Sequence, residues 1–173
     1  IVPTSSTTTQ LALGDAIALA CMKCKNFTKL DFKKIHPSGN LSIRLKTVND
    51  LMVTGKKLPI INENMKMIKA LKIINDKKMG VIIIQKKNKI TSGIVTDGDL
   101  KRIAQKYKNF EDLEIKKVMK KNPISVDKDM LAAKSLSIMS DKKITSLCVH
   151  KKKNKKKTIG ILHIHHILNA NIQ

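Results

Sequence analysis

Aromatic and arginine residues are scarce in this chain, and their scarcity limits what its high charge can mean. The 173 residues include three Phe, one Tyr and no Trp, and only Arg44 and Arg102 are arginines, although the formal net charge is +22. Proteins that read bases favour Arg, and proteins that bind single strands stack bases on aromatic rings. The abundant Lys, Asn and Ile share A/T-rich codons, so a drift in base composition explains the charge. We expect no specific nucleic-acid partner.

Cysteines and long apolar runs are also few. Cys21, Cys24 and Cys148 do not form a disulfide framework, and this count fits a reducing compartment, so we expect a cytoplasmic protein. Cys21 and Cys24 form one Cys-x-x-Cys pair without a second, which favours two helix cysteines over a zinc site. No run approaches the roughly 20 apolar residues of a membrane span, so no membrane partner is expected.

The first part of the chain has the pattern of two helices. Residues 1–3 resemble the end of a buried strand and no Met precedes them, so we expect further sequence upstream. The hydroxyl-rich residues 4–9 are typical of a helix cap. The helix that follows, about residues 11–22, is apolar nearly all round, and we expect segments outside this chain to bury it. Thr28 is predicted to cap a second, short helix that ends near Ile35.

From about residue 51 the chain repeats itself. Leu51-Met52 recurs as Val118-Met119, and Gly93-Ile94-Val95-Thr96 recurs as Gly160-Ile161-Leu162-His163, each 67 residues later. Between these segments the offset is 65, which predicts a hairpin two residues longer in the second copy, at the lysine run 151–157. Each copy has the periodicity of strand, helix, two-strand hairpin and helix. We expect the lysine run to be a solvated hairpin loop.

This β-α-β-β-α repeat resembles the CBS domain, because it has Thr96-Asp97-Gly98-Asp99-Leu100 at the strand-to-helix turn. The resemblance covers about residues 48–173 and implies two copies that pack as a pseudo-symmetric pair. The expected fold class is α/β (α+β), a tandem CBS pair. The expected division is residues 1–47, 48–106 for the first CBS domain and 107–173 for the second.

The remaining segment is similar to the end of a sugar isomerase (SIS) domain. Its Pro3-Thr4-Ser5-Ser6-Thr7-Thr8 and His36-Pro37-Ser38-Gly39 segments, followed by Thr96 to Leu100 and Leu162 to His165, occur in the order found in arabinose 5-phosphate isomerases. Ser38 and Ser42 stand where that family usually has Gly. The chain is therefore expected to carry the terminal helices of a truncated SIS-type α/β domain before its CBS pair.

The resemblance implies a function for the intact protein. Arabinose 5-phosphate isomerases interconvert D-ribulose 5-phosphate and D-arabinose 5-phosphate for 3-deoxy-octulosonate and lipopolysaccharide synthesis, and they are homotetramers. Their catalytic Glu residues and main phosphate loop lie upstream of the part matched here. We therefore expect a regulatory part of such an isomerase, inactive alone, without a required cofactor, that binds a nucleotide or nucleotide-sugar effector or supports oligomerisation.

Two groups in the first 47 residues are candidates for the sugar-phosphate site. By the resemblance, His36 is the active-site histidine, whose imidazole suits general acid-base help in ring opening; the alternative is an ordinary loop histidine. The hydroxyls of Thr4, Ser5, Ser6, Thr7 and Thr8 precede a helix N-terminus, where backbone N–H groups favour anions. They either line the substrate site or only cap the helix.

The effector candidates lie at the two equivalent turns. In nucleotide-binding CBS pairs the Thr hydroxyl reaches phosphate and the Asp carboxylate binds ribose, and Thr96 and Asp99 match these positions, with Asp97 as an extra acid. The alternative is that Thr96 and Asp99 cap the following helix. His163 and His166 hold the same positions in the second copy. A histidine cannot imitate a ribose-binding carboxylate, so we expect at most one well-formed nucleotide site.

Other interpretations are kept beside this one. His163, His165 and His166 invite a metal hypothesis, but no nearby acid or Cys completes a ligand set, and we expect no metal. A free-standing CBS pair that senses nucleotides is the alternative function. A basic nucleic-acid binder is the third hypothesis, and it requires binding that weakens steeply with salt.

Overall fold

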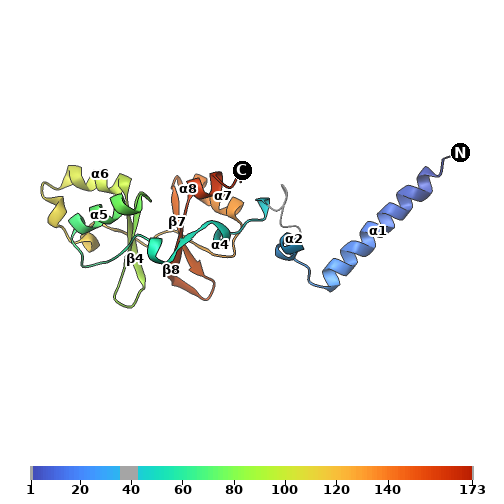
Figure 1. Cartoon of the computed structure of the whole chain (residues 1–173), viewed down its shortest axis with the longest axis horizontal. Coiled ribbons are helices and arrows are strands. Elements are labelled where there is room, and N and C mark those ends of the chain that lie inside the picture. Colours follow the sequence, from blue (N-terminus) through green and yellow to red (C-terminus); the bar gives the residue numbers. More distant parts are fainter. Residues whose placement is uncertain (1, 36–42, 173) are drawn as a thin grey trace. The chain divides into compact units, whose positions relative to one another are not determined.

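The computed structural model describes residues 2–35 and 43–172. The chain divides into two compact units, with the boundary between Leu45 and Lys46. The first unit contains helices α1 (Thr4–Cys24) and α2 (Lys29–Ile35), and the second contains both repeats (Figure 1). The mixed helix-and-sheet architecture of the second unit confirms the predicted fold class.

Helix α1 begins earlier than its hydroxyl-rich start predicts. Its N-cap is Pro3, which makes no side-chain cap, and the helix starts at Thr4. The Thr7 and Thr8 hydroxyls donate to the Thr4 carbonyl at 3.0 and 2.9 Å, so they lie within the helix and bond to its own backbone. The prediction that residues 4–9 precede and cap the helix is therefore wrong.

Helix α1 has no buried residue in the described part of the chain. Its exposed large side chains are Leu11, Leu13, Ile17, Leu19 and Met22. Helix α2 begins as predicted after Thr28, whose backbone N–H and hydroxyl both donate to the Asp31 carboxylate, at 3.0 and 2.6 Å. The Asp31 N–H donates back to the Thr28 hydroxyl at 3.3 Å, which completes a reciprocal cap.

The second unit contains two copies of one element order. The first copy consists of α4 (Val48–Leu51), β1 (Val53–Thr54), the 3₁₀ turn η1 (Gly55–Lys57), β2 (Ile60–Asn62), α5 (Met67–Lys77), β3 (Val81–Gln85), β4 (Thr91–Thr96) and α6 (Asp97–Lys106). The 3₁₀ turn η2 (Phe110–Asp112) follows. The second copy consists of η3 (Ile115–Lys117), β5 (Lys120–Lys121), β6 (Ser125–Asp127), α7 (Ala132–Lys142), β7 (Ser146–Lys151), β8 (Asn154–His163) and α8 (Ile164–Leu168).

The two copies exchange their first strands. One sheet has the order β1-β8-β7-β6 and the other β2-β3-β4-β5, so each sheet holds one short strand from the other copy. Val53 of β1 pairs with Ile161, and Lys120 of β5 pairs with Ile94. These pairs are related by the 67-residue offset. Within the copies, the Ile60–Ile83 and Ser125–Cys148 pairs show the 65-residue offset, which confirms the predicted two-residue difference.

Two glycines permit this exchange. A Cβ atom on Gly93 would lie 2.6 Å from the Lys120 carbonyl oxygen and 2.7 Å from Met119 Sδ. A Cβ atom on Gly160 would lie 2.6 Å from Met52 Sδ. The repeated methionine and the repeated glycine of the sequence are thus two sides of one contact, in which the strand of one copy lies close against the other copy.

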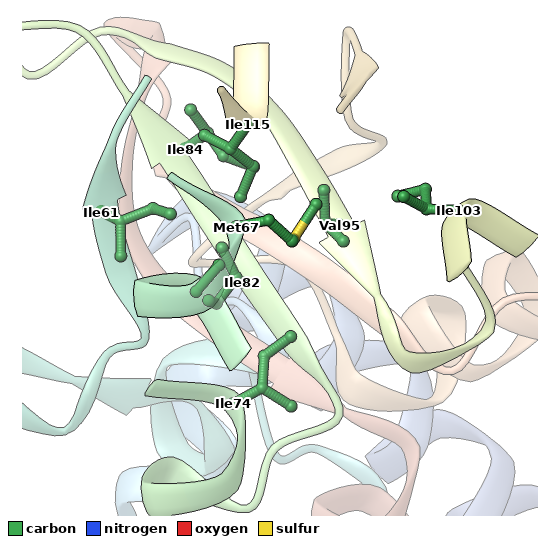
Figure 2. Packing of buried hydrophobic residues seen from close by; sticks show 9 residues of the cluster. Ile61, Met67, Ile74, Ile82, Ile84, Val95, Ile103 and Ile115 are labelled. Carbon is green, nitrogen blue, oxygen red and sulfur yellow. The ribbon is translucent and has the colours of Figure 1, made fainter. Parts of the chain in front are cut away.

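Strand β3 is buried on both faces, and each face meets a different neighbour. In β3, Ile82 and Ile84 pack with Met67, Val95 and the other residues of the first copy's core (Figure 2). The alternate side chains, Val81 and Ile83, pack against Cys148 and Ile161 of the second copy. A strand without a solvent face accounts for the continuous apolar run in the sequence.

The lysine run differs from its predicted form. Strand β7 continues to Lys151 and strand β8 starts at Asn154, so Lys155, Lys156 and Lys157 lie in an exposed strand and not in a loop. The hairpin itself is as predicted. The extra residues of this hairpin extend its two strands and not its turn. Side chains on such a two-stranded ribbon alternate in direction, and the lysines on it stay exposed to solvent.

Candidate functional site

A cleft of 470 Å³ lies between the two copies. Its wall includes the turn from β4 to α6, the segment from β5 to β6, the turn from α7 to β7, and His163. The apolar wall residues include Ile94, Ile124 and Ile144. The basic ones are Arg102, Lys120, Lys121 and Lys143. A cleft with an apolar wall and a cationic rim suits an organic anion.

Thr96 and Asp99 form a reciprocal cap at the start of α6. The Thr96 N–H and hydroxyl donate to Asp99 Oδ2 at 3.0 and 2.7 Å, and the Asp99 N–H donates to the Thr96 hydroxyl at 3.3 Å. The capping interpretation of these residues is therefore confirmed, with the helix starting at Asp97, directly after Thr96. Thr96 also lines the cleft, whereas Asp99 is 5% exposed and lies behind it.

The Asp99 carboxylate has two cationic partners as well. Its Oδ1 accepts from Arg102, three residues along α6, and from Lys120 Nζ of β5 at 2.8 Å. Burial alone would raise the pKa of Asp99, but the hydrogen bonds from Lys120, Thr96 and Arg102 outweigh burial and lower the pKa well below its usual range. The ion pair with Lys120 connects the turn of the first copy to the exchanged strand of the second.

Asp97 is the first residue of α6, in the same turn. Its N–H donates to the Gly80 carbonyl at 3.0 Å, and a Cβ atom on Gly80 would lie 3.0 Å from Asp97 Oδ2. Gly80 has a φ of 62°, a value that side chains disfavour, so this position needs glycine for its backbone conformation as well as for space. Both Asp97 and Gly80 line the cleft.

His163 and His166 form the equivalent cap in the second copy. The His163 N–H donates to His166 Nδ1 at 3.3 Å, and the His165 N–H donates to His163 Nδ1 at 3.2 Å. Because each Nδ1 accepts, each neutral ring carries its proton on Nε2. Burial, followed by the neighbouring imidazoles, lowers the pKa of both rings below the ordinary value. A protonated Nδ1 cannot accept these bonds, so the cap requires neutral rings.

The predicted effector residues are therefore divided between two layers. Thr96, Asp97 and His163 meet in the cleft, whereas Asp99 and His166 are not among its lining residues. Sequence reasoning missed Arg102 and Lys120. The spacing of Asp99 and Arg102 on one helix is a signal for their pair, but Lys120 comes from the other copy and had no signal in the sequence.

The 67-residue relation shows that the two turns are not equivalent. Asp97 corresponds to Ile164 and Arg102 to Asn169, so the second copy lacks both charges. Lys120 of the second copy corresponds to Val53 of the first. The charged groups of the effector candidates are thus concentrated on one side of the pseudo-symmetric pair.

The other predicted residues have separate outcomes. Thr4, Ser5, Ser6, Thr7 and Thr8 lie in the exposed first turns of α1. His36 lies outside the described residues. Over residues 2–35 and 43–172, no group of three His, Cys, Asp or Glu side chains is arranged to hold a metal. Cys21 and Cys24 are free and exposed on α1.

Comparison with known proteins assigns the class. Residues 48–106 and 115–172 each match the model of the CBS domain, so the chain belongs to the CBS domain family and carries a tandem pair. Its fold is similar to the crystal structure of CBSX2 in complex with AMP, with a TM-score of 0.64 and 22% identity over 72% of this chain and 95% of that chain. The CBS pair of MJ0100, solved with 5′-methylthioadenosine and S-adenosyl-L-methionine, has a TM-score of 0.64 and 18% identity over 72% and 94%.

The curated relatives are more specific. The chain is 36% identical over 173 residues to arabinose 5-phosphate isomerase KdsD of Escherichia coli K12, which is 99% of this chain and 52% of that protein. It is 37% identical over 174 residues to KdsD of Francisella tularensis, again over 52% of the relative. The chain therefore spans about half the length of the curated relatives it matches, and the match includes residues outside the CBS pair. In the part of the chain that the structure describes, no helix has the length and apolarity needed to cross a bilayer.

Proposed function

We infer that this chain is the regulatory part of a cytoplasmic arabinose 5-phosphate isomerase, and that its CBS pair binds a nucleotide-type effector. The observation that carries the inference is the 36–37% identity to such isomerases over 99–100% of the chain. A free-standing CBS module, the alternative, gives no reason for similarity across residues 1–47. These residues are then the end of the sugar isomerase domain, and residues 48–106 and 107–173 are the two CBS domains.

The cleft supports an effector that combines an apolar ring system with phosphate. Ile94, Ile124 and Ile144 offer an apolar wall for a base. Helix α6, which has ten residues, starts at the cleft, where Thr96 and Gly98 line the wall, and the positive end of a helix dipole favours a phosphate. CBS pairs of the same fold have been solved with AMP and with adenosyl compounds, which makes adenine nucleotides the first compounds to test.

The existing contacts of Asp99 give this proposal a mechanism. Its carboxylate forms ion pairs with Arg102 and Lys120. A phosphate that attracts these cations would release one carboxylate oxygen for a ribose hydroxyl. Binding would thereby replace an ion pair between the copies with contacts through the ligand, and it would change how β5 is held against α6.

Calorimetric titration tests the effector site. The compounds are AMP, ATP, CMP and a nucleotide-activated sugar, titrated into the wild-type chain and into Asp99→Asn. The asparagine keeps an oxygen that accepts the Thr96 bonds but removes the charge. We expect binding of at least one compound and a loss of about tenfold in the variant, the size expected when one charged hydrogen bond is removed. No binding by any compound would refute the sensor role and favour a role of the CBS pair in oligomerisation.

The catalytic half of the proposal concerns the intact protein. Sugar phosphate is its proposed substrate, with His36 as an acid-base group and residues Thr4 to Thr8 near the phosphate. The chain alone is expected to be inactive towards ribulose 5-phosphate, because the catalytic Glu residues of the family belong to the upstream part. Turnover by the purified chain would contradict this. A homo-oligomer, tetrameric as in the family, is expected for the intact enzyme, and light scattering measures its mass.

A further inference from the structure

A second hollow lies apart from the turn of Thr96 and Asp99. It is a groove of 610 Å³, within the range of about 300–1,000 Å³ that is typical of small-molecule sites. We define the basic groove by its four lysines, Lys86, Lys116, Lys121 and Lys156. The hydroxyls of Thr91 and Ser92 and the amide of Asn122 line it as well, and Glu63 is its acidic residue.

Among the residues that the structure describes, three of these lysines have no carboxylate partner. Lys116 is paired with Glu114 at 2.8 Å. Within the described ranges, Lys86, Lys121 and Lys156 form no ion pair, in contrast with Lys120, which is held by Asp99 in the neighbouring cleft. With Glu63 as the opposing charge, the groove has an unbalanced positive charge at neutral pH. Ammonium groups gathered around a hollow that also offers the side-chain amide of Asn122 form a pattern that binds phosphate groups.

The groove is built jointly by the two copies. Lys86 and Thr91 lie at the two ends of the loop that joins β3 to β4 in the first copy, whereas Lys156 comes from β8 of the second. Two hydrogen bonds join the two hairpins. The Thr91 hydroxyl donates to the Thr158 hydroxyl at 2.8 Å and accepts the Thr158 N–H at 3.2 Å. These two threonines are 67 residues apart and lie at the pseudo-symmetry axis.

The longer second hairpin places one groove lysine differently from its counterpart in the repeat. By the 67-residue offset, Lys156 corresponds to Lys89, which lies in the tight turn of the shorter hairpin with a φ of 63°. Lys121 corresponds to Thr54. The equivalent face on the other side of the axis therefore has Thr54 and a turn lysine at these two positions, whereas the counterpart of Lys86 by the 65-residue offset is again a lysine, Lys151. The two faces therefore differ in where their lysines lie, although both carry lysines.

We propose that the basic groove is an anion-binding site for a ligand with several phosphate groups, distinct from the cleft of Thr96 and Asp97. The cleft and the groove share Lys121 and Asn122 as lining residues. A ligand in the groove therefore contacts the same β5–β6 segment that forms a wall of the cleft, and occupancy of one hollow affects the other.

Inorganic tripolyphosphate is the probe. It lacks a base and a ribose, so it cannot make apolar contacts with the isoleucines of the cleft. It is titrated into the wild-type chain at about 0.15 M salt, where a Debye length of about 8 Å suppresses the diffuse field of the charged surface. The test variant is Lys86→Gln with Lys156→Gln. The control is Lys72→Gln with Lys142→Gln, which removes the same charge from exposed positions on α5 and α7. All four lysines are exposed, so both variants should fold, and circular dichroism verifies this.

We expect the groove variant to weaken tripolyphosphate binding about tenfold or more and the control to change it less than about twofold, because only the groove lysines would contact phosphate oxygens. Amide shifts in NMR spectra should gather at residues 86–92 and 121–122. Equal losses in the two variants, an absence of binding, or shifts confined to Thr96 to Gly98 would each overturn the proposal. Failure of this proposal is distinguishable from failure of the effector site, since AMP binding tests the cleft and tripolyphosphate tests the groove.

Discussion

Replacing Gly93 or Gly160 by alanine tests whether the strand exchange depends on close backbone approach. At Gly93 the new Cβ would meet the Lys120 carbonyl oxygen at 2.6 Å and Met119 Sδ at 2.7 Å. At Gly160 the corresponding contacts are Met52 Sδ at 2.6 Å and the Val53 carbonyl oxygen at 3.1 Å. The two sites are related by the repeat, but only at Gly93 is a backbone atom closer than any Cβ tolerates.

The expected costs follow from which atom has to move. Overpacking typically costs about 1–3 kcal/mol. A thioether can rotate away, so we expect Gly160→Ala near the lower end, about 1 kcal/mol. Relief at Gly93 requires the two-residue strand β5 to move off β4, so we expect Gly93→Ala near the upper end, about 3 kcal/mol. Urea unfolding measures both, and thermal unfolding should show a shift of a few degrees for each kcal/mol.

Methionine truncation makes the comparison sharper. Combined with Gly160→Ala, Met52→Ala should recover much of the loss, because it removes the closest atom. Combined with Gly93→Ala, Met119→Ala should recover little, because the Lys120 carbonyl remains. A double-mutant cycle for each pair measures this coupling. Full recovery at Gly93, or a greater cost at Gly160 than at Gly93, would refute the argument that backbone contact limits this position.

Three further outcomes are expected. Interactions in the folded state lower the pKa of Asp99, so its contribution to stability is present above the unfolded pKa of about 3.9 and is lost as the pH falls below that value. The free energy of unfolding of Asp99→Asn, measured with urea, should therefore depend less on pH in this acid range than that of the wild type. The pKa values of His163 and His166 are also lowered, so the folded state binds fewer protons than the unfolded state, and stability should fall as the pH drops below about 6.5. The double variant His163→Thr with His166→Asp gives the second copy the same cap residues as the first and should reduce this dependence of stability on pH. An unchanged dependence would contradict the neutral-ring cap. Burial raises the pKa of the Cys148 thiol to about 11, so iodoacetamide at pH 8 should label the exposed Cys21 and Cys24 in the native chain and Cys148 only in denaturant. Mass spectrometry of the peptides measures this labelling, and rapid labelling of Cys148 in the native chain would contradict its burial.

The sequence predicted those parts of the fold that depend on local spacing. The 67- and 65-residue offsets gave the element order and the extra length of the second hairpin, and Thr28 with Asp31 formed the predicted start of α2. The lysine run was misjudged because charge indicates solvation but does not separate a loop from an exposed strand. The hydroxyls of residues 4–9 were misjudged because Ser and Thr satisfy themselves either at a cap or on the preceding turn of a helix.

The candidate site was predictable only within each copy. Thr96, Asp97 and His163 were found from the repeated turn, and they do meet in one cleft. The partnership of Asp99 with Lys120 was not predictable, because a repeat pattern does not reveal which copy supplies a strand to which sheet. The role of the methionines was not predictable for the same reason. Met52 and Met119 stand at the start of the two copies, but each lies close to the repeated glycine of the other copy.

Because β1 and β5 are exchanged, the fold of each CBS copy depends on the other. Each four-stranded sheet is complete only when the other copy contributes its edge strand, and the shared apolar layer of Val81, Ile83, Cys148 and Ile161 lies between them. Neither half of the repeat can therefore reach its final structure before the other is made, so the pair should form late during synthesis and melt in a single transition. A chain cut between the copies would yield two complementary fragments rather than two small domains.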